Sequence, residues 1–243
     1  MDTARDLFRT DGPDTTLAMS RPEIFCADKI LAVRFGIEQV VLSWSLTRPG
    51  FSRADTVAWL EVAEADLPID VDPIALLRGR LTEAGFGDAV QFMTARDIRK
   101  HHRATRRSGD ATAFCLTTVG LANAGRVGET ITGPRLIGTI NLVAHVDQPL
   151  DQGGLVEALS IATEARTAAV MDLGWRKDGL LVTGTGTDCI AAACPLEGRT
   201  RTYAGLHTDI GAAIGGAVYD AVSAGGLQWL AENAEKTQGR EER

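Results

Sequence analysis

The chain has 243 residues, of which 44% are hydrophobic, 23% charged and 5% aromatic, and its formal net charge is −7. This length predicts one large domain or two small ones, and the apolar fraction excludes a disordered or fibrous chain. The negative charge disfavours a dedicated nucleic-acid-binding protein, because neutralising phosphates requires clustered Lys and Arg. No apolar signal segment and no run of roughly 18 apolar residues is visible, so we expect a cytoplasmic protein without a membrane partner.

The cysteines are spaced too widely for a common metal motif. The chain has four of them, Cys26, Cys115, Cys189 and Cys194, and none forms a CxxC pair. No two histidines have the spacing of metal ligands on a helix either. We therefore predict reduced, inert thiols, no metal and no cofactor.

Polar ends frame a single predicted domain. Residues 1–20 predict an arm and residues 235–243 a charged tail, which leaves residues 21–234 as the domain. Short β-branched apolar runs predict strands at Ile30–Phe35, Gln39–Ser45, Ala89–Thr94, Thr112–Val119, Leu136–Val146 and Leu180–Thr183, with Ile190–Ala193 as an alanine-rich candidate. Gly36-Ile37 lies between the first two runs and predicts a hairpin.

Three segments carry helical signals. Asp72–Ala84 has Pro73 in its first turn, and Gly154–Leu173 has apolar residues at helical spacing before Gly174. A third helix is predicted to begin near Thr208-Asp209, since both residues are good N-caps. Together these elements predict an α/β (α+β) fold: one layered domain with a mixed, partly antiparallel sheet covered by a few long helices.

Glycine gathers in the second half, where 18 of the 26 glycines lie between Gly120 and Gly226. Four segments combine glycine with short polar side chains, and each follows a predicted strand or precedes a helix. They are residues 117–123, 138–141, 183–188 and 203–208. Such loops expose main-chain N–H groups that can hold a phosphate, an oxyanion or an amide. We therefore expect a ligand to meet the main chain in this half.

The segment Thr183–Asp188 is the first candidate for catalysis. It lacks the Lys of a P-loop and the GxGxxG spacing, which argues against phosphate binding. Asp188 could act as a general base or as an orienting group, with loop N–H groups stabilising a developing oxyanion. The alternative is a tight turn whose hydroxyl and carboxylate groups cap local backbone.

The histidines have different surroundings. His207 precedes a predicted helix N-terminus, which favours a neutral imidazole able to move a proton near pH 7, although a solvent-facing residue is the alternative. His101 and His102 lie in Arg96–Arg107, whose six Lys and Arg predict a solvated basic face or, alternatively, an anion contact. His145 ends an apolar strand, which predicts a hydrogen-bonded histidine near the core.

Other polar and aromatic candidates each have two interpretations. Glu164 lies on the polar face of its helix, where a solvated carboxylate is the default. Asn123 and Asn141 follow strand-like runs and could be turn residues or could recognise another amide. Trp44 could be a core aromatic or a flat surface for a flat ligand.

The order of these motifs is more informative than any one of them. It reads Val119-Gly120-Leu121-x-Asn123, Gly138-Thr139-Ile140-Asn141, Thr163-Glu164-Ala165, Gly184-Thr185-Gly186-Thr187-Asp188, and Tyr203-Ala204-Gly205 with His207-Thr208 and Gly211. From Ile24 to Val222 the chain thereby resembles the adenosylcobinamide amidohydrolase family. The loop Thr47-Arg48-Pro49-Gly50 departs from the Asn-Gly-Gly turn that is usual in that family.

The resemblance implies hydrolysis of the amide that joins aminopropanol to a propionate side chain of adenosylcobinamide. The products would be adenosylcobyric acid and 1-amino-2-propanol, in the salvage or remodelling of cobalamin-type corrinoids. The partner would be this small-molecule substrate, with no nucleic acid or membrane, and the chain could form a homo-oligomer.

A hypothesis for the site follows from that reaction. Asp188 or Glu164 would be the base, the Gly184–Thr187 main chain would hold the oxyanion, and His207 would protonate the amine. The residues expected to bind the substrate are Asn123, Asn141, Thr139, Gly184, Gly186, Thr187 and Trp44.

Three alternatives stay open. Thr185 and Thr187 each follow a glycine, so self-cleavage could expose a threonine amine that activates its own hydroxyl. A non-catalytic module that binds corrinoids or nucleotides could use the same loops only to hold its ligand. An amidohydrolase acting on an unrelated amide or lactam is the third.

Overall fold

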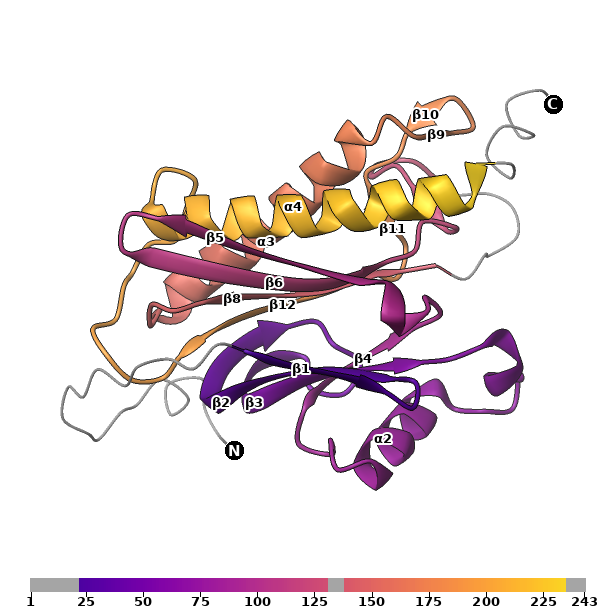
Figure 1. Cartoon of the computed structure of the whole chain (residues 1–243), viewed down its shortest axis with the longest axis horizontal. Coiled ribbons are helices and arrows are strands. Elements are labelled where there is room, and N and C mark those ends of the chain that lie inside the picture. The colour runs from indigo at the N-terminus through magenta and orange to yellow at the C-terminus, as the bar shows by residue number, and fades with distance from the viewer. Residues whose placement is uncertain (1–21, 131–137, 235–243) are drawn as a thin grey trace.

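The computed structural model describes residues 22–130 and 138–234 (Figure 1). The longer strands are β1 (Glu23–Ala27), β2 (Ile30–Ser43), β3 (Gly50–Glu61), β4 (Val90–Thr94), β5 (His101–Ser108), β6 (Ala111–Val119), β8 (Ile140–Val146) and β12 (Cys189–Pro195). They form an eight-stranded sheet in the order β4-β3-β2-β12-β8-β6-β5, with β1 paired to β2. Four two-residue strands lie outside it: β7 (Ala124–Gly125), β9 (Arg176–Lys177), β10 (Leu180–Leu181) and β11 (Gly184–Thr185).

The sheet folds so that its two halves face each other across an apolar core (Figure 1). Phe35, Trp59 and Phe92 come from β2, β3 and β4, and they pack with Phe114 and Leu116 of β6. Trp59 and Phe92 meet edge to face, with ring centroids 5.1 Å apart. This arrangement is favourable for aromatic pairs and adds to the burial that holds the halves together.

Helices cover both outer faces. The helix α2 (Pro73–Glu83) buries Leu77 and Leu81 against the half formed by β2, β3 and β4. The helices α3 (Gln152–Asp172) and α4 (Asp209–Glu232) cover the half formed by β12, β8, β6 and β5 (Figure 1). The pairs β3–β4 and β8–β12 are parallel and the other pairs in the large sheet are antiparallel. The predicted α+β class with a mixed sheet in one domain is therefore confirmed.

The three predicted helices are confirmed, with the expected starts of α2 and α4 and the expected glycine after α3. Asp72 caps α2 by accepting a hydrogen bond from the Ile74 amide, at 2.9 Å. Thr208 caps α4 in the same way through the Gly211 amide, also at 2.9 Å. Gly174 follows the end of α3 with a φ of +69°, a backbone conformation that favours glycine. The predicted terminal arm and tail, and the proposed strand start at Leu136, lie outside the described residues.

The predicted hairpin at Gly36-Ile37 is wrong, because residues 30–43 form one continuous strand. β2 pairs with β3 at Arg34–Thr56 and next at Gln39–Ala54. Between these two pairs β2 advances by five residues and β3 by only two. The extra residues form a bulge in which Gly36 has a φ of +77°. A bulge and a turn both need such a glycine, which is why the sequence signal was ambiguous.

Three strands of the large sheet, β1, β3 and β5, were not predicted from the sequence. The residues of β5 lack apolar alternation because it is the edge strand of the sheet, where charged side chains reach solvent and discourage pairing with other chains. Arg103 and Arg107 are exposed, as expected of a solvated basic face. That prediction is wrong for Arg96, whose side chain is only 10% exposed.

The predictions for His145 and the cysteines agree with the structure. His145 is buried, its Nε2 lies 3.1 Å from Gln39 Oε1, and its ring stacks on Phe35. All four cysteines are free thiols. Burial raises the pKa of the Cys189 thiol to about 11 and that of the Cys194 thiol to about 12, so neither is a ready nucleophile at neutral pH.

One described helix, α4, is long and apolar enough to cross a membrane by length and composition alone. In this structure it packs against β5, β6 and α3, and its buried stripe runs from Ile210 to Trp229. Its apolar character is therefore accounted for by the core that it completes.

Candidate functional site

Three of the four glycine-rich segments meet at one end of the sheet. β8 runs parallel to β12 and antiparallel to β6, so the starts of β8 and β12 lie beside the end of β6. We call residues 120–125, 138–140 and 183–188 the loop end. The short strands β7 and β11 pair there, with Thr185 opposite Ala124. Loops distant in the chain are thereby held in a fixed arrangement.

Asp188 lies at the centre of the loop end. Its side chain is 6% exposed. Its Oδ1 accepts a hydrogen bond from the Ile140 amide at 3.0 Å, and its Oδ2 accepts one from the Thr185 amide at 3.1 Å. The Thr185 hydroxyl also donates to Oδ1. Asp188 therefore holds two segments together and orients a hydroxyl.

Arg166 on α3 forms an ion pair with Asp188. Its side chain is 11% exposed, and burial lowers the pKa of its guanidinium. Gly184 makes this pair possible, because a Cβ there would lie directly on Arg166 Nη1. Arg166 was not predicted as a site residue. The signal was present, since Arg166 follows Ala162 by four residues on the apolar stripe of α3.

Thr187 joins the other two segments. Its hydroxyl donates to the Gly138 carbonyl at 2.8 Å and accepts from Asn123 Nδ2 at 3.3 Å. Thr139 donates to the Thr187 carbonyl at 2.7 Å. Gly138 approaches the main chain of residues 120–123 so closely that a Cβ would clash there. Asn123, Thr139 and Thr187 are therefore brought together, as the sequence analysis expected of one site.

Asn141 is fully buried beneath this network. Its Oδ1 accepts from the Cys189 amide at 3.1 Å and from the Thr139 hydroxyl at 3.0 Å. Its Nδ2 donates to the Met93 carbonyl at 2.7 Å, which ties the loop end to the other half of the sheet. With these partners, Asn141 holds the loop end in place from the buried start of β8.

The exposed rim carries groups that a ligand can reach. Gly186 and Thr187 are exposed, and their main-chain N–H groups donate to no described residue. Trp44 is 41% exposed, and its Nε1 donates to the Asp188 carbonyl at 2.6 Å. The interpretation of Trp44 as a core aromatic is wrong. It is an exposed flat ring anchored to the main chain of Asp188.

Two predicted catalytic residues lie apart from Asp188. The start of α4 contacts the β5–β6 turn, where Ser108 bonds Asp209, so His207 lies at the far end of the sheet from the loop end (Figure 1). Gly225 of α4 lies against Val119 at the end of β6, so the two ends are about 24 Å apart along the helix from Asp209. Glu164 is exposed on α3 and contacts Ser160 at 3.4 Å. The hypothesis that joined His207 and Glu164 to Asp188 in one site is therefore corrected.

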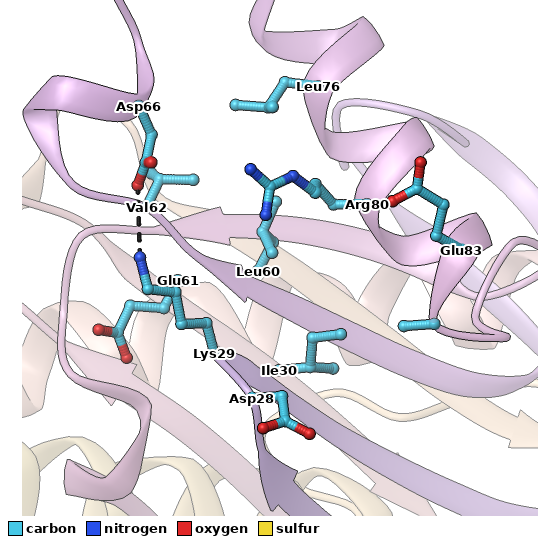
Figure 2. Close-up of a pocket in the computed structure, with 11 residues that line it drawn as sticks. Asp28, Lys29, Ile30, Leu60, Glu61, Val62, Asp66, Leu76, Arg80 and Glu83 are labelled. Atoms are coloured by element: carbon cyan, nitrogen blue, oxygen red, sulfur yellow. Dashed lines mark ion pairs between the residues drawn. The ribbon is translucent and has the colours of Figure 1, made fainter.

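The described residues form hollows in two different places. One of about 310 Å³ adjoins the loop end and is lined in part by Gly120 and Gly138. Another of about 280 Å³ lies between α2 and the hairpin of β1 and β2 (Figure 2). There Lys29 and Asp66 form an ion pair of 3.6 Å above apolar side chains. None of the sequence-predicted site residues lines this second hollow.

The loop end is equipped for acyl chemistry. Thr185 supplies a half-exposed hydroxyl bonded to a carboxylate, and residues 186–187 supply neighbouring N–H donors. Amide hydrolysis needs a nucleophile beside a proton acceptor. It also needs hydrogen-bond donors, such as main-chain N–H groups, that stabilise the oxyanion. Within residues 22–130 and 138–234, no three His, Cys, Asp or Glu side chains gather closely enough to hold a metal ion.

A family model and a curated protein similar to this chain carry the same family name. A model of the adenosylcobinamide amidohydrolase family matches residues 15–234. An adenosylcobinamide amidohydrolase of Halobacterium salinarum is 30% identical over 155 residues, which span 60% of this chain and 63% of that protein. The crystal structure of the PH0078 protein from Pyrococcus horikoshii OT3 is similar with a TM-score of 0.42 and 13% identity, over 84% of this chain and 77% of that one. The chain belongs to the adenosylcobinamide amidohydrolase family.

Proposed function

We propose that this protein hydrolyses the aminopropanol amide of adenosylcobinamide, releasing adenosylcobyric acid and 1-amino-2-propanol. Membership of the family supports the substrate class. The observation that carries the proposal is the loop end itself. There the Thr185 hydroxyl meets the buried Asp188 carboxylate beside the N–H groups of residues 186–187, which have no acceptor among the described residues. In this proposal the reaction belongs to corrinoid salvage in the cytoplasm.

In the proposed mechanism Thr185 is the nucleophile. Its oxygen attacks the amide carbon, and Asp188 receives the hydroxyl proton and passes it to the departing amine. The N–H groups of Gly186 and Thr187 hold the oxyanion that develops on the carbonyl. Water then hydrolyses the ester on Thr185 to give the carboxylate product. Arg166 pairs with Asp188 and holds it in position.

The rim of the loop end suits a wide, mostly apolar guest with neutral amides. Trp44 and Leu46 are each 41% exposed, and Trp44 is anchored through its ring nitrogen to the main chain of Asp188. A flat guest placed on Trp44 would lie next to residue 188 of the loop end. Asn123 contacts Thr187 of the same loop end, and its amide can recognise another amide.

The direct test is incubation of the protein with adenosylcobinamide, followed by mass spectrometry of the corrinoid and an assay for free amine. We expect equal amounts of 1-amino-2-propanol and of a corrinoid carrying one new carboxylate. A corrin absorbance change on mixing without amine release would instead favour a binding module. The absence of both changes would favour an amidohydrolase for another amide.

The intact mass separates this mechanism from self-cleavage. The Thr185 amide donates a hydrogen bond to the Asp188 carboxylate, and Thr185 pairs with Ala124 in a short strand. The peptide bond before Thr185 is therefore held inside folded structure. We expect active protein to remain one chain of 25.9 kDa. Two fragments cut before Thr185 or Thr187 would contradict the proposed mechanism and favour a terminal threonine amine as the base.

A further inference from the structure

The hollow beside the loop end is lined by charged side chains of both signs. It measures about 310 Å³ and lies where the segment after β4 passes the end of α4. Arg96 and Lys100 line one side, Glu232 and Trp229 line another, and Gly120 and Gly138 connect it to the loop end. Since both glycines lack side chains, their main chain forms part of the wall.

The two cations of this hollow share one carboxylate. Arg96 Nη1 contacts Glu232 Oε2 at 2.6 Å, and Lys100 Nζ contacts Glu232 Oε1 at 3.1 Å. Asp97 also lines the hollow, but Arg99 holds both of its oxygens, at 2.9 and 2.8 Å. The lining therefore carries two cations and two carboxylates, of which Asp97 is held by Arg99 outside the lining.

Arg96 has further unused donors. Its side chain is 10% exposed, and its Nε and Nη2 atoms are buried without an acceptor in the described part of the chain. These two N–H groups form the edge of the guanidinium fork that binds planar or tetrahedral oxyanions with two parallel hydrogen bonds. Buried donors without acceptors are costly, and therefore each such group in a folded protein calls for an explanation.

We propose that this hollow is a binding site for an oxyanion group, a carboxylate or a phosphate, held by Arg96 and Lys100. The site is distinct from Thr185 and Asp188, and the inference does not depend on the proposed hydrolysis. Glu232 competes with the ligand, because it occupies one donor of Arg96 and the ammonium of Lys100. The pKa of Glu232 is lowered to about 2 by its hydrogen bond from Arg96, so this competition persists at neutral pH.

The test titrates the full chain with inorganic phosphate and, separately, with propionate at constant ionic strength, by calorimetry. We expect both anions to bind, and the tighter of the two identifies whether the natural group is a phosphate or a carboxylate. Lys100→Met should weaken binding about tenfold, since a charge-assisted hydrogen bond is lost. Glu232→Gln should tighten it about tenfold, because the shared donors are released. Arg103→Met removes an exposed charge from β5, outside the lining, and should change nothing.

Two results would overturn the proposal. One is the absence of binding by either anion, or binding that Lys100→Met leaves unchanged. The other is a Glu232→Gln variant that folds, as judged by circular dichroism, yet binds both anions no better than the unaltered chain. In that case Arg96 and Lys100 serve only to neutralise Glu232 and the carbonyl end of α4.

Discussion

Asp188 and Arg166 carry opposite charges that are both nearly removed from water, with side chains 6% and 11% exposed. Removing one partner of such a pair leaves the other as an uncompensated buried charge. We therefore expect Asp188→Asn to lower the free energy of unfolding by about 3–5 kcal/mol. The double variant Asp188→Asn with Arg166→Met should be clearly more stable than Asp188→Asn alone.

Urea denaturation of the unaltered protein, of Asp188→Asn and of the double variant measures the coupling between Asp188 and Arg166. Asp220→Asn is the matched control, because Asp220 pairs with Arg106 on the surface and should cost no more than about 1 kcal/mol. Equal losses for Asp188→Asn and for the double variant would contradict the assigned ion pair.

His145 gives the fold a dependence on pH. Burial lowers the pKa of its imidazole from 6.5 to about 4, so between these values the unfolded chain binds a proton that the folded chain does not. The free energy of unfolding that the neutral imidazole contributes is fully present above pH 6.5 and is lost as the pH falls towards 4. The total loss is at most about 3 kcal/mol. Denaturation midpoints between pH 7 and 5 should fall, and the slope should flatten in His145→Asn. An unchanged slope in that variant would assign the dependence to other groups.

At single positions the sequence was informative where a residue type has one dominant use. Asp188, Thr185 and Thr187 were named because short polar side chains beside glycines can present main-chain donors, and the structure brings them together. Arg166 was missed because a charged residue on a helix is assumed to be solvated. Its position on the apolar stripe, in a helix with no other Lys or Arg, was the overlooked sign.

At the scale of elements, β11 and the turn that follows it contain two glycines with opposite surroundings. A Cβ on Gly184 would lie against Arg166 Nη1 and Asp188 Oδ2, whereas a Cβ on Gly186 would meet nothing within 4 Å. Gly184→Ala should therefore displace the ion pair and lower the melting temperature by several degrees. Gly186→Ala should melt within about a degree of the unaltered protein. Differential scanning calorimetry of both variants checks this, and equal effects would contradict the packing at Gly184.

The helices were predictable because caps and apolar spacing are local signals, as at Asp72 and Thr208. The strands were harder to predict, because a strand forms by pairing with residues distant in the chain. The glycine of the β2 bulge was interpreted as a turn, since only the pairing with β3 distinguishes the two. The strand β5 carries arginines because it is an edge, a property of the assembled sheet that no local pattern reveals.

At the scale of the whole molecule, the glycine-rich segments lie at opposite ends of the sheet. The loops at residues 120–125, 138–140 and 183–188 share one end, while Thr208 and His207 begin α4 at the other. The order of motifs along the chain could indicate the family but not this separation, because the direction of a helix across a sheet is a matter of topology. The site is thus assigned to the loop end alone.

The most direct test of this account is the turnover of adenosylcobinamide by Thr185→Val, measured as released 1-amino-2-propanol. Valine keeps the shape of threonine but lacks the hydroxyl that Asp188 orients, so we expect turnover to fall by at least about 100-fold. Thr105→Val on the edge strand β5 removes a hydroxyl far from the loop end and should retain full turnover. A folded Thr185→Val protein that releases amine at the rate of Thr105→Val would contradict the account.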